Sequence, residues 1–144
     1  MPSSQLTSCY PLITTPLLAE SRDFFVRHFG FEVGFEASWF VWLSRSAGES
    51  GTVALAFMTP DHPSRPPGPE VFNNQGLLLT LQVDDALGEE QRLREAGVQI
   101  TYPVRHEPWG QVRFQVRAPS GLVLDIVEQA EPAAGFWDPY MAGA

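Results

Sequence analysis

The stretch EPWGQVRFQVRAPSGLVLDIVE, residues 107–128, decides the fold. Apolar and polar residues alternate over 111–117, which predicts a strand with one buried face. After a turn at 119–121, an almost wholly aliphatic run over 122–128 predicts a second, more buried strand. This second strand carries one carboxylate, Asp125, at its centre. The role of an acid in a strand that is otherwise apolar is the main question that the sequence raises.

The rest of the chain repeats one pattern of elements twice. A strand, a helix and three strands are predicted in the first half, at 10–14, 16–29, 31–36, 39–45 and 52–58. The same order is predicted in the second half, at 77–83, 86–96, 98–104, 111–117 and 122–128. Gly30 and Gly97 end the two helices and lie 97 − 30 = 67 positions apart. The sequence therefore predicts a duplicated β-α-β-β-β unit.

The duplication gives the predicted boundaries. We expect a first module at 1–58, a connector at 59–75 and a second module at 76–129, which together form one structural domain. The connector contains five prolines, which exclude a regular element. A tail over 130–144 is broken by Pro and Gly, and we expect its aromatic side chains to pack on a neighbouring surface: Phe136, Trp137 and Tyr140.

Composition restricts the partners and the compartment. The net charge is −8, and all nine basic residues are Arg. This charge repels nucleic acid and anionic membranes, and it weakly favours a cationic small molecule. Cys9 is the single cysteine and forms no internal disulfide, as is usual in a reducing compartment. No signal peptide and no apolar run of about 18 residues is visible, so we expect a cytoplasmic protein.

Several short motifs occur in a fixed order along this pattern. They are Ser21-x-x-Phe24-Phe25 followed by Gly30-Phe31, then Val83-Asp84-Asp85, Ala96-Gly97-Val98, Pro108-Trp109-Gly110-Gln111 and Pro119-x-Gly121. With them, residues 9–129 resemble the glyoxalase / bleomycin-resistance / extradiol-dioxygenase superfamily, also called vicinal oxygen chelate proteins. The resemblance implies an α+β fold in which two tandem modules form curled mixed sheets around a concave cavity. It also implies a homodimer.

The resemblance also locates the metal ligands of those members that use a metal. They lie near the start of each module's first strand and on each module's last strand. The corresponding residues here are Tyr10, Leu77 or Leu78, Asp125 and, by the offset of 67, Met58. A divalent ion needs three or four oxygen or nitrogen ligands, and this set offers at most one good one. We therefore expect no metal and no cofactor.

Asp125 is open to three interpretations. It can contact a ligand or act in catalysis, it can be structural, or it can bind metal. Alternation places Leu122, Leu124 and Ile126 against the helix and Asp125 on the opposite face, toward the predicted cavity. A buried carboxylate without partners costs several kcal/mol, so we expect a hydrogen bond from a donor such as Tyr10 or Arg113, or a protonated acid.

The large aromatic residues have two interpretations each. Trp39, Trp42 and Trp109 can be core residues, or they can stack on a flat ligand in the cavity. Tyr10 is interpreted as a cavity wall, with a hydrogen bond to ligand as the alternative.

Arg113 lies opposite the apolar face of its strand. It can be solvated, or it can point into the cavity and pair with Asp125 or an anionic ligand group. Related sequences often carry Arg-His at Val112-Arg113 and Asp at Ala118, and both differences weaken the transfer of a specific activity. His106 and Glu107 are not expected to act as an acid–base pair, since adjacent residues at a strand end point apart.

These residues lead to one main hypothesis. The protein is predicted to be a metal-free small-molecule-binding protein of the bleomycin-resistance type, which sequesters an aromatic or cationic compound. Its expected ligand-contacting residues are Tyr10, Trp39, Trp42, Met58, Trp109, Arg113 and Asp125. One alternative is an enzyme, either metal-dependent through unexpected ligands or metal-free with Asp125 as base. Another is an interaction module with a degenerate cleft.

Overall fold

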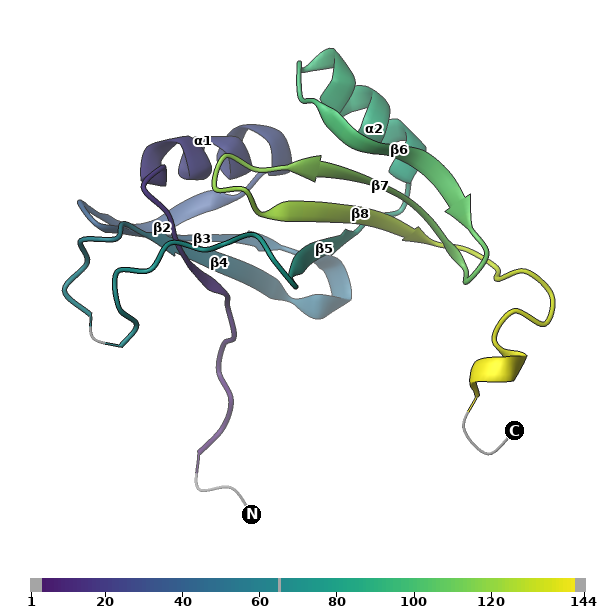
Figure 1. The fold of residues 1–144 in the computed structure, drawn as a ribbon, viewed down its shortest axis with the longest axis horizontal. Coiled ribbons are helices and arrows are strands. Elements are labelled where there is room, and N and C mark those ends of the chain that lie inside the picture. The colour runs from purple at the N-terminus through teal and green to yellow at the C-terminus, as the bar shows by residue number, and fades with distance from the viewer. Residues whose placement is uncertain (1–3, 65, 142–144) are drawn as a thin grey trace. The chain divides into compact units, whose positions relative to one another are not determined.

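The computed structural model describes residues 4–64 and 66–141, which form two compact units. The first unit ends at Asn73 and the second begins at Asn74. The first contains β1 (Leu12–Thr14), α1 (Leu18–Phe29), β2 (Glu32–Ala37), β3 (Phe40–Ser46) and β4 (Thr52–Met58). The second contains β5 (Leu78–Gln82), α2 (Ala86–Glu95), β6 (Ile100–Glu107), β7 (Gln111–Arg117) and β8 (Val123–Gln129). Each unit is a four-stranded sheet with a helix against one face (Figure 1).

The two sheets have the same topology. Their strand orders are β1-β4-β3-β2 and β5-β8-β7-β6. In each, the first strand pairs in parallel with the last, and the other neighbours are antiparallel. The predicted β-α-β-β-β duplication and the α+β fold class are confirmed. No helix of the described chain is long and apolar enough to cross a membrane.

Local signals in the sequence explain where the helices begin and end. At the end of α1, the backbone N–H of Gly30 donates to the carbonyl of Phe25. Gly30 has a φ of 69°, and only glycine adopts this left-handed conformation without a steric cost. At the start of α2, the Asp85 carboxylate accepts a hydrogen bond from the backbone N–H of Gly88. Asp85 is therefore the N-cap of α2.

The repeat offset is not constant along the chain, and this corrects one prediction. It is 67 at the two helix-ending glycines but 71 in the last hairpin, because β3 and β4 correspond to β7 and β8 (111 − 40 = 71; 123 − 52 = 71). The registers agree, since Ser44 pairs with Ala54 where Gln115 pairs with Asp125. The counterpart of Asp125 is therefore Ala54 and not Met58.

β6 is longer than predicted. It extends to Glu107, so His106 lies in a strand and not in the loop before Trp109. Pro103 interrupts the sequence pattern, but β6 is an edge strand, where a missing backbone N–H costs no ladder bond. The register between β6 and β7 shifts on both sides of Tyr102, which gives this edge its irregular twist.

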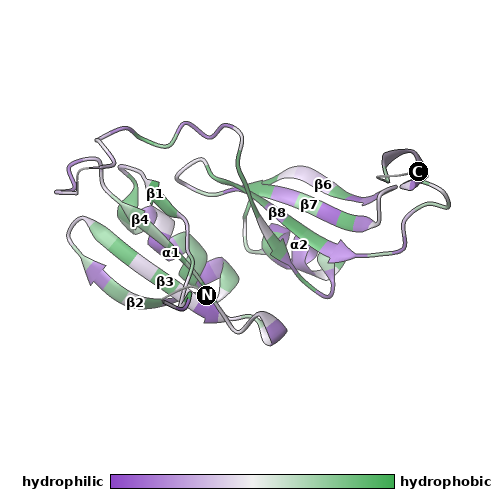
Figure 2. Ribbon diagram, turned by 90° about the horizontal axis from the view of Figure 1, so that it is seen from below, coloured by the Kyte–Doolittle hydropathy of each residue, from purple (hydrophilic) through white to green (hydrophobic). Residues whose placement is uncertain are grey.

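The two faces of each sheet differ in chemistry. In the second unit, Val112, Phe114 and Val116 are buried on the α2 side, and Gln111, Arg113, Gln115 and Arg117 alternate with them on the other side. The alternation is visible as bands of colour along β7 (Figure 2). We call the side away from the helix the helix-free face of each sheet. In the first unit this face is apolar, with Leu12, Phe35, Trp42 and Ala56 in one cross-strand row.

The predicted connector contains no helix or strand in its described residues. His62 is buried in it, and its Nε2 lies 3.0 Å from the carbonyl oxygen of Gly68. Residues 142–144 of the predicted tail lie outside the described residues.

Candidate functional site

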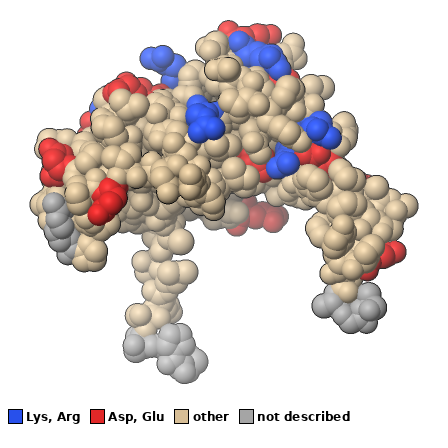
Figure 3. Space-filling view, viewed as in Figure 1, with Lys and Arg blue, Asp and Glu red and all other residues tan. Residues whose placement is uncertain are grey.

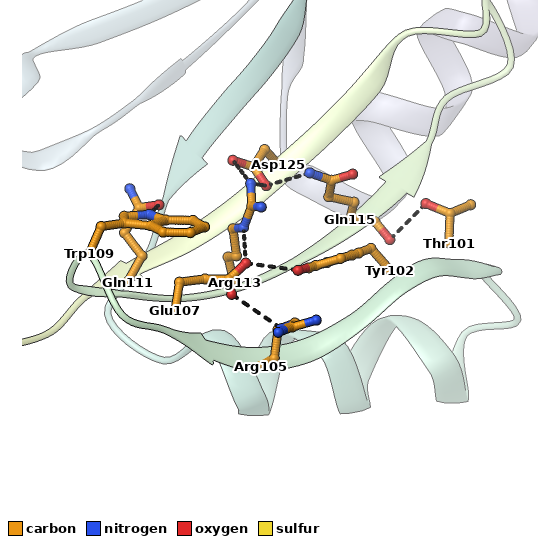
Figure 4. Close-up of polar contacts among 9 residues, drawn as sticks. All are labelled: Thr101, Tyr102, Arg105, Glu107, Trp109, Gln111, Arg113, Gln115 and Asp125. Atoms are coloured by element: carbon orange, nitrogen blue, oxygen red, sulfur yellow. Dashed lines mark hydrogen bonds and ion pairs between the residues drawn. The ribbon is translucent and has the colours of Figure 1, made fainter. Parts of the chain in front are cut away.

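A polar network covers the helix-free face of the second sheet. Gln111, Arg113 and Gln115 reach this face from β7 by strand alternation, and register places Asp125 of β8 opposite Gln115. Figure 4 shows these side chains converging with those of β6. Since the opposite face is filled by the core against α2, the sheet itself separates this network from the core.

Asp125 is held inside this network. Its residue is only 5% exposed, and its Oδ1 accepts a hydrogen bond of 2.9 Å from Nε2 of Gln115. Nη1 of Arg113 lies farther away, 3.4 Å from Oδ1 and 3.5 Å from Oδ2. Asp125 lies on the sheet face that alternation predicts, and Arg113 is a donor to it as predicted. The cavity that Asp125 was expected to face stays a prediction. Tyr10, the other predicted donor, lies in the first unit, and its bond to Asp125 stays a prediction.

Arg113 is fixed on several sides. Its Nε donates to Oε2 of Glu107 at 2.7 Å, and its guanidinium lies 5.1 Å from the ring centre of Tyr102 and 5.0 Å from that of Trp109. The side chain is 19% exposed, so the interpretation of Arg113 as a solvated strand residue is wrong. Because Arg113 contacts two rings and two carboxylates, few orientations of its guanidinium are open to it.

Glu107 was not predicted as a site residue from the sequence, and neither were Tyr102, Gln111 and Gln115. The side chain of Glu107 is 2% exposed, and it accepts hydrogen bonds from the Tyr102 hydroxyl at 2.8 Å and from Arg113. Nε of Arg105 also lies 3.1 Å from Oε1. The register of β6 against β7 pairs Glu107 with Gln111, which is the signal that would have placed it on this face. His106, its neighbour, is exposed.

The hydrogen bonds and charges of this network shift the pKa of Glu107 and that of Arg113 in opposite directions. Burial acts to raise the pKa of Glu107, but the hydrogen bonds from Arg113 and Tyr102 and the two nearby guanidinium charges outweigh it, and the pKa is lowered. Burial acts to lower the pKa of Arg113, but the Glu107 hydrogen bond and the Asp125 charge outweigh it, and this pKa is raised. Both groups are therefore held in their charged forms.

Trp109 closes one end of this network. Its Nε1–H donates to Oε1 of Gln111 at 2.8 Å, and its ring stacks on the Arg113 guanidinium. The Trp137 indole N–H donates to the Trp109 carbonyl at 2.9 Å. Of the seven predicted ligand-contacting residues, Trp109, Arg113 and Asp125 are thus brought together in one unit.

The other four predicted residues lie in the first unit: Tyr10, Trp39, Trp42 and Met58. Tyr10 meets Trp42 edge to face, with ring centres 6.3 Å apart. Trp42 covers Gly34 so closely that a Cβ at Gly34 would overlap its ring. Met58 is 1% exposed. Their role in binding a ligand stays a prediction.

The residues at the expected metal-ligand positions do not fit a divalent ion. Asp125 already faces the Gln115 amide and the Arg113 guanidinium, and a fixed positive charge beside a lone carboxylate opposes metal binding. Its counterpart in the first sheet, Ala54, has no ligand atom. Within the described residues, no three His, Cys, Asp or Glu side chains are placed to hold a metal ion.

The family model of the Glyoxalase/Bleomycin resistance protein/Dioxygenase superfamily matches residues 9–126. The chain belongs to this superfamily. Among curated proteins, none matches the sequence.

Solved structures share the fold at low sequence identity. A glyoxalase/bleomycin resistance protein/dioxygenase from Nocardioides is 17% identical with a TM-score of 0.71, over 90% of this chain and 87% of the other. A glyoxalase-related enzyme from Fulvimarina pelagi is 21% identical with a TM-score of 0.68, over 88% and 89%. A lactoylglutathione lyase from Agrobacterium tumefaciens is 16% identical with a TM-score of 0.64, over 88% and 94%. These similarities support the fold and leave function to the site.

Proposed function

We propose that this protein binds a cationic or aromatic small molecule without a metal and sequesters it. The observation that carries the proposal is the charge balance on the helix-free face of the second sheet. Two nearly buried carboxylates, Glu107 and Asp125, share one partly exposed guanidinium, that of Arg113. Arg105, the other cation near Glu107, is 62% exposed and contributes little there. The buried part of this network therefore carries an excess negative charge.

The excess charge lies on Asp125. Glu107 takes the short bond of 2.7 Å from Arg113, whereas the contacts of Asp125 with Arg113 are 3.4 and 3.5 Å. Oδ1 of Asp125 has the Gln115 amide, but Oδ2 has only the longest of these contacts among the described residues. A carboxylate oxygen accepts about two hydrogen bonds, so Oδ2 can still accept one from an N–H group of a ligand.

The surroundings of Asp125 suit binding by a preformed site. Arg113, Gln115 and Trp109 are all held by hydrogen bonds or ring contacts before any ligand arrives. A site whose side chains are already ordered loses little conformational entropy on binding. Sequestration needs this affinity and no positioned acid or base.

The test is a titration of the purified protein with a panel of planar aromatic cations and their neutral isosteres, followed by tryptophan fluorescence. Asp125→Asn keeps the shape and removes the charge. We expect it to weaken the cations by about 1–3 kcal/mol, or about 5- to 150-fold, and to leave the neutral compounds unchanged.

A matched control separates a local effect from the overall charge. Glu95→Gln removes one negative charge from the exposed end of α2 in the same unit. It should leave the affinity within about twofold, because Glu95 is exposed on the helix side of the sheet and its charge is screened by solvent and salt. Equal affinities of the cations for the wild-type protein and Asp125→Asn would refute the role of Asp125.

The enzyme alternative has its own decisive outcome. Elemental analysis of the purified protein tests for a bound divalent metal. A stoichiometric metal that is lost in Asp125→Ala would overturn the proposal in favour of metal-dependent catalysis. The homodimer implied by the resemblance is also part of the proposal, and sedimentation analysis tests it.

A further inference from the structure

The C-terminal segment, residues 130–141, is attached to the turn between β6 and β7. The backbone N–H of Ala130 donates to the Gly110 carbonyl, and that of Ala133 donates to the Pro108 carbonyl, both at 2.8 Å. At Gly110, where φ is 112°, a Cβ would lie 2.9 Å from the Ala130 carbonyl oxygen. Only glycine allows the segment to approach this turn so closely. The turn therefore positions both Trp109 and the C-terminal segment.

Four aromatic rings meet where the segment lies against this turn. An open pocket of about 330 Å³ at the surface is lined by Trp109, Phe136, Trp137 and Tyr140. Phe136 is the central ring, and it makes angles of 50° with Trp109, 87° with Trp137 and 41° with Tyr140. The rings are thus inclined to one another around Phe136 and are not stacked in parallel. We call this arrangement the aromatic cage.

The polar edges of both indoles are already occupied. The Trp109 N–H donates to Gln111, and the Trp137 N–H donates to the Trp109 carbonyl. Neither indole therefore has a free N–H to offer a ligand, and what remains is the π-system of each ring, whose face attracts cations. The Trp109 ring already does so within this protein, since the Arg113 guanidinium lies 5.0 Å from its centre. Glu107 at 2.7 Å matches that charge, so Arg113 does not leave a free positive charge beside the cage.

The charges around the cage favour a cation as well. The sequence from 130 to 144 contains two acids, Glu131 and Asp138, and no basic residue. In the space-filling view, this segment at the lower right shows red atoms and no blue ones (Figure 3). Asp138 belongs to the same short 3-10 helix, Asp138–Tyr140, as one of the cage rings.

We infer that the aromatic cage binds a quaternary ammonium group. Such a group has no N–H and needs no hydrogen-bond acceptor, whereas a primary ammonium brings three N–H donors that four ring faces cannot satisfy. The cage shares Trp109 with the site proposed above, but it is lined by none of Arg113, Gln115 or Asp125, so it is a second binding feature beside that site.

The test uses choline and its neutral isostere 3,3-dimethylbutan-1-ol as probes of the full-length protein. Binding is followed by the indole N–H signal of Trp137 in two-dimensional NMR spectra. We expect choline to shift this signal saturably and the isostere to bind at least about tenfold more weakly, because only the charge differs. Tyr140→Leu should weaken choline by about tenfold by the same signal, and Trp137→Leu should do so when binding is followed by the indole N–H signal of Trp109.

Two controls distinguish a variant that no longer folds from one that folds but has lost the aromatic cage. Tyr140 is 69% exposed, so Tyr140→Leu should keep the amide signals of β7 and β8 unchanged. Leu87→Ala removes a similarly exposed apolar side chain from α2, at 61%, and should bind choline as the wild-type protein does.

Three results would overturn the inference. One is a Trp137 signal that choline does not shift saturably, and another is equal binding of the neutral isostere. The third is a sedimentation profile in which Tyr140→Leu abolishes a dimer, which would identify the four rings as an interface between two copies. The proposed function would survive each of these results if the protein still bound planar cations and if that binding still depended on Asp125.

Discussion

Replacing Glu107 with Gln should destabilise the second unit at neutral pH. Glu107 is 2% exposed at its side chain and holds Arg113 through a hydrogen bond of 2.7 Å. It also accepts from Tyr102 at 2.8 Å. Gln has the same shape, but it removes the charge that compensates Arg113 and adds an amide N–H₂ beside two donors.

The magnitude follows from what each contact contributes. Removing one partner of a buried ion pair costs about 3–5 kcal/mol. The cost for Glu107→Gln should be lower, because Arg113 is 19% exposed and keeps its contact with Asp125. A hydrogen bond to a charged group contributes about 1.5–3 kcal/mol, and a neutral amide oxygen recovers part of it. Arg105 is 62% exposed and adds less than about 1 kcal/mol. We expect a loss of about 2–3 kcal/mol.

The loss should depend on pH with a defined sign. The pKa of Glu107 in the folded protein lies below its ordinary value of 4.5. Its contribution is therefore fully present above this value and disappears as the pH falls from 4.5 through the folded-state pKa. Urea unfolding, followed by the NMR amide signals of β7 and β8, measures this in the second unit alone. The difference between the two proteins should be constant above about pH 6 and should shrink below pH 4.5.

Glu131→Gln is the control, since Glu131 is an exposed carboxylate of the same unit. It should change the free energy of unfolding by less than about 0.5 kcal/mol at any of these pH values. The reasoning fails if Glu107→Gln is as stable as the wild-type protein at pH 7. It fails equally if the difference between them grows on acidification.

Two further predictions concern glycines against which other groups pack. Gly110→Ala forces a strained φ of 112° and a Cβ 2.9 Å from the Ala130 carbonyl oxygen. It should cost about 1–3 kcal/mol and speed hydrogen exchange at the Trp137 indole N–H, whereas unchanged protection there would contradict the attachment of the C-terminal segment. Gly34→Ala places a methyl group in the Trp42 ring, and we expect a cost of about 1–3 kcal/mol with an altered near-ultraviolet circular dichroism spectrum. A spectrum identical to the wild type would show that Trp42 does not pack on Gly34.

The fold was predictable because its signals are local. The alternation over 111–117 and the aliphatic run after it fall on β7 and β8 within one residue. The glycines after both helices lie where each helix ends, since each has a positive φ that other residues rarely adopt. Hydrophobic periodicity and chain reversals depend on neighbours in sequence, so one sequence is enough to read them.

The site was predictable only in part, because its partners depend on register. Asp125 was placed on the correct face by alternation alone, but Glu107 required the pairing of β6 with β7. Pro103 and the register shifts around Tyr102 hide that pairing from the sequence pattern. The uniform offset of 67 was likewise wrong for β4, because four additional residues separate Gly97 from the hairpin in the second unit (71 − 67 = 4). Register in an edge strand is decided by contacts that no local pattern carries.

The correct correspondence explains why an acid occupies the centre of β8. In the equivalent hairpin of the first unit, Trp42 replaces Arg113 and Ala54 replaces Asp125, and that helix-free face is apolar. A carboxylate placed alone on such a face would lack donors and would cost several kcal/mol. In the second unit the acid is tolerated because Gln115 and Arg113 donate to it and Glu107 neutralises Arg113 in turn. The same fold therefore presents an apolar sheet face in one unit and a charged one in the other. The charged face, which can still accept a hydrogen bond at Asp125, is where ligand chemistry should be sought.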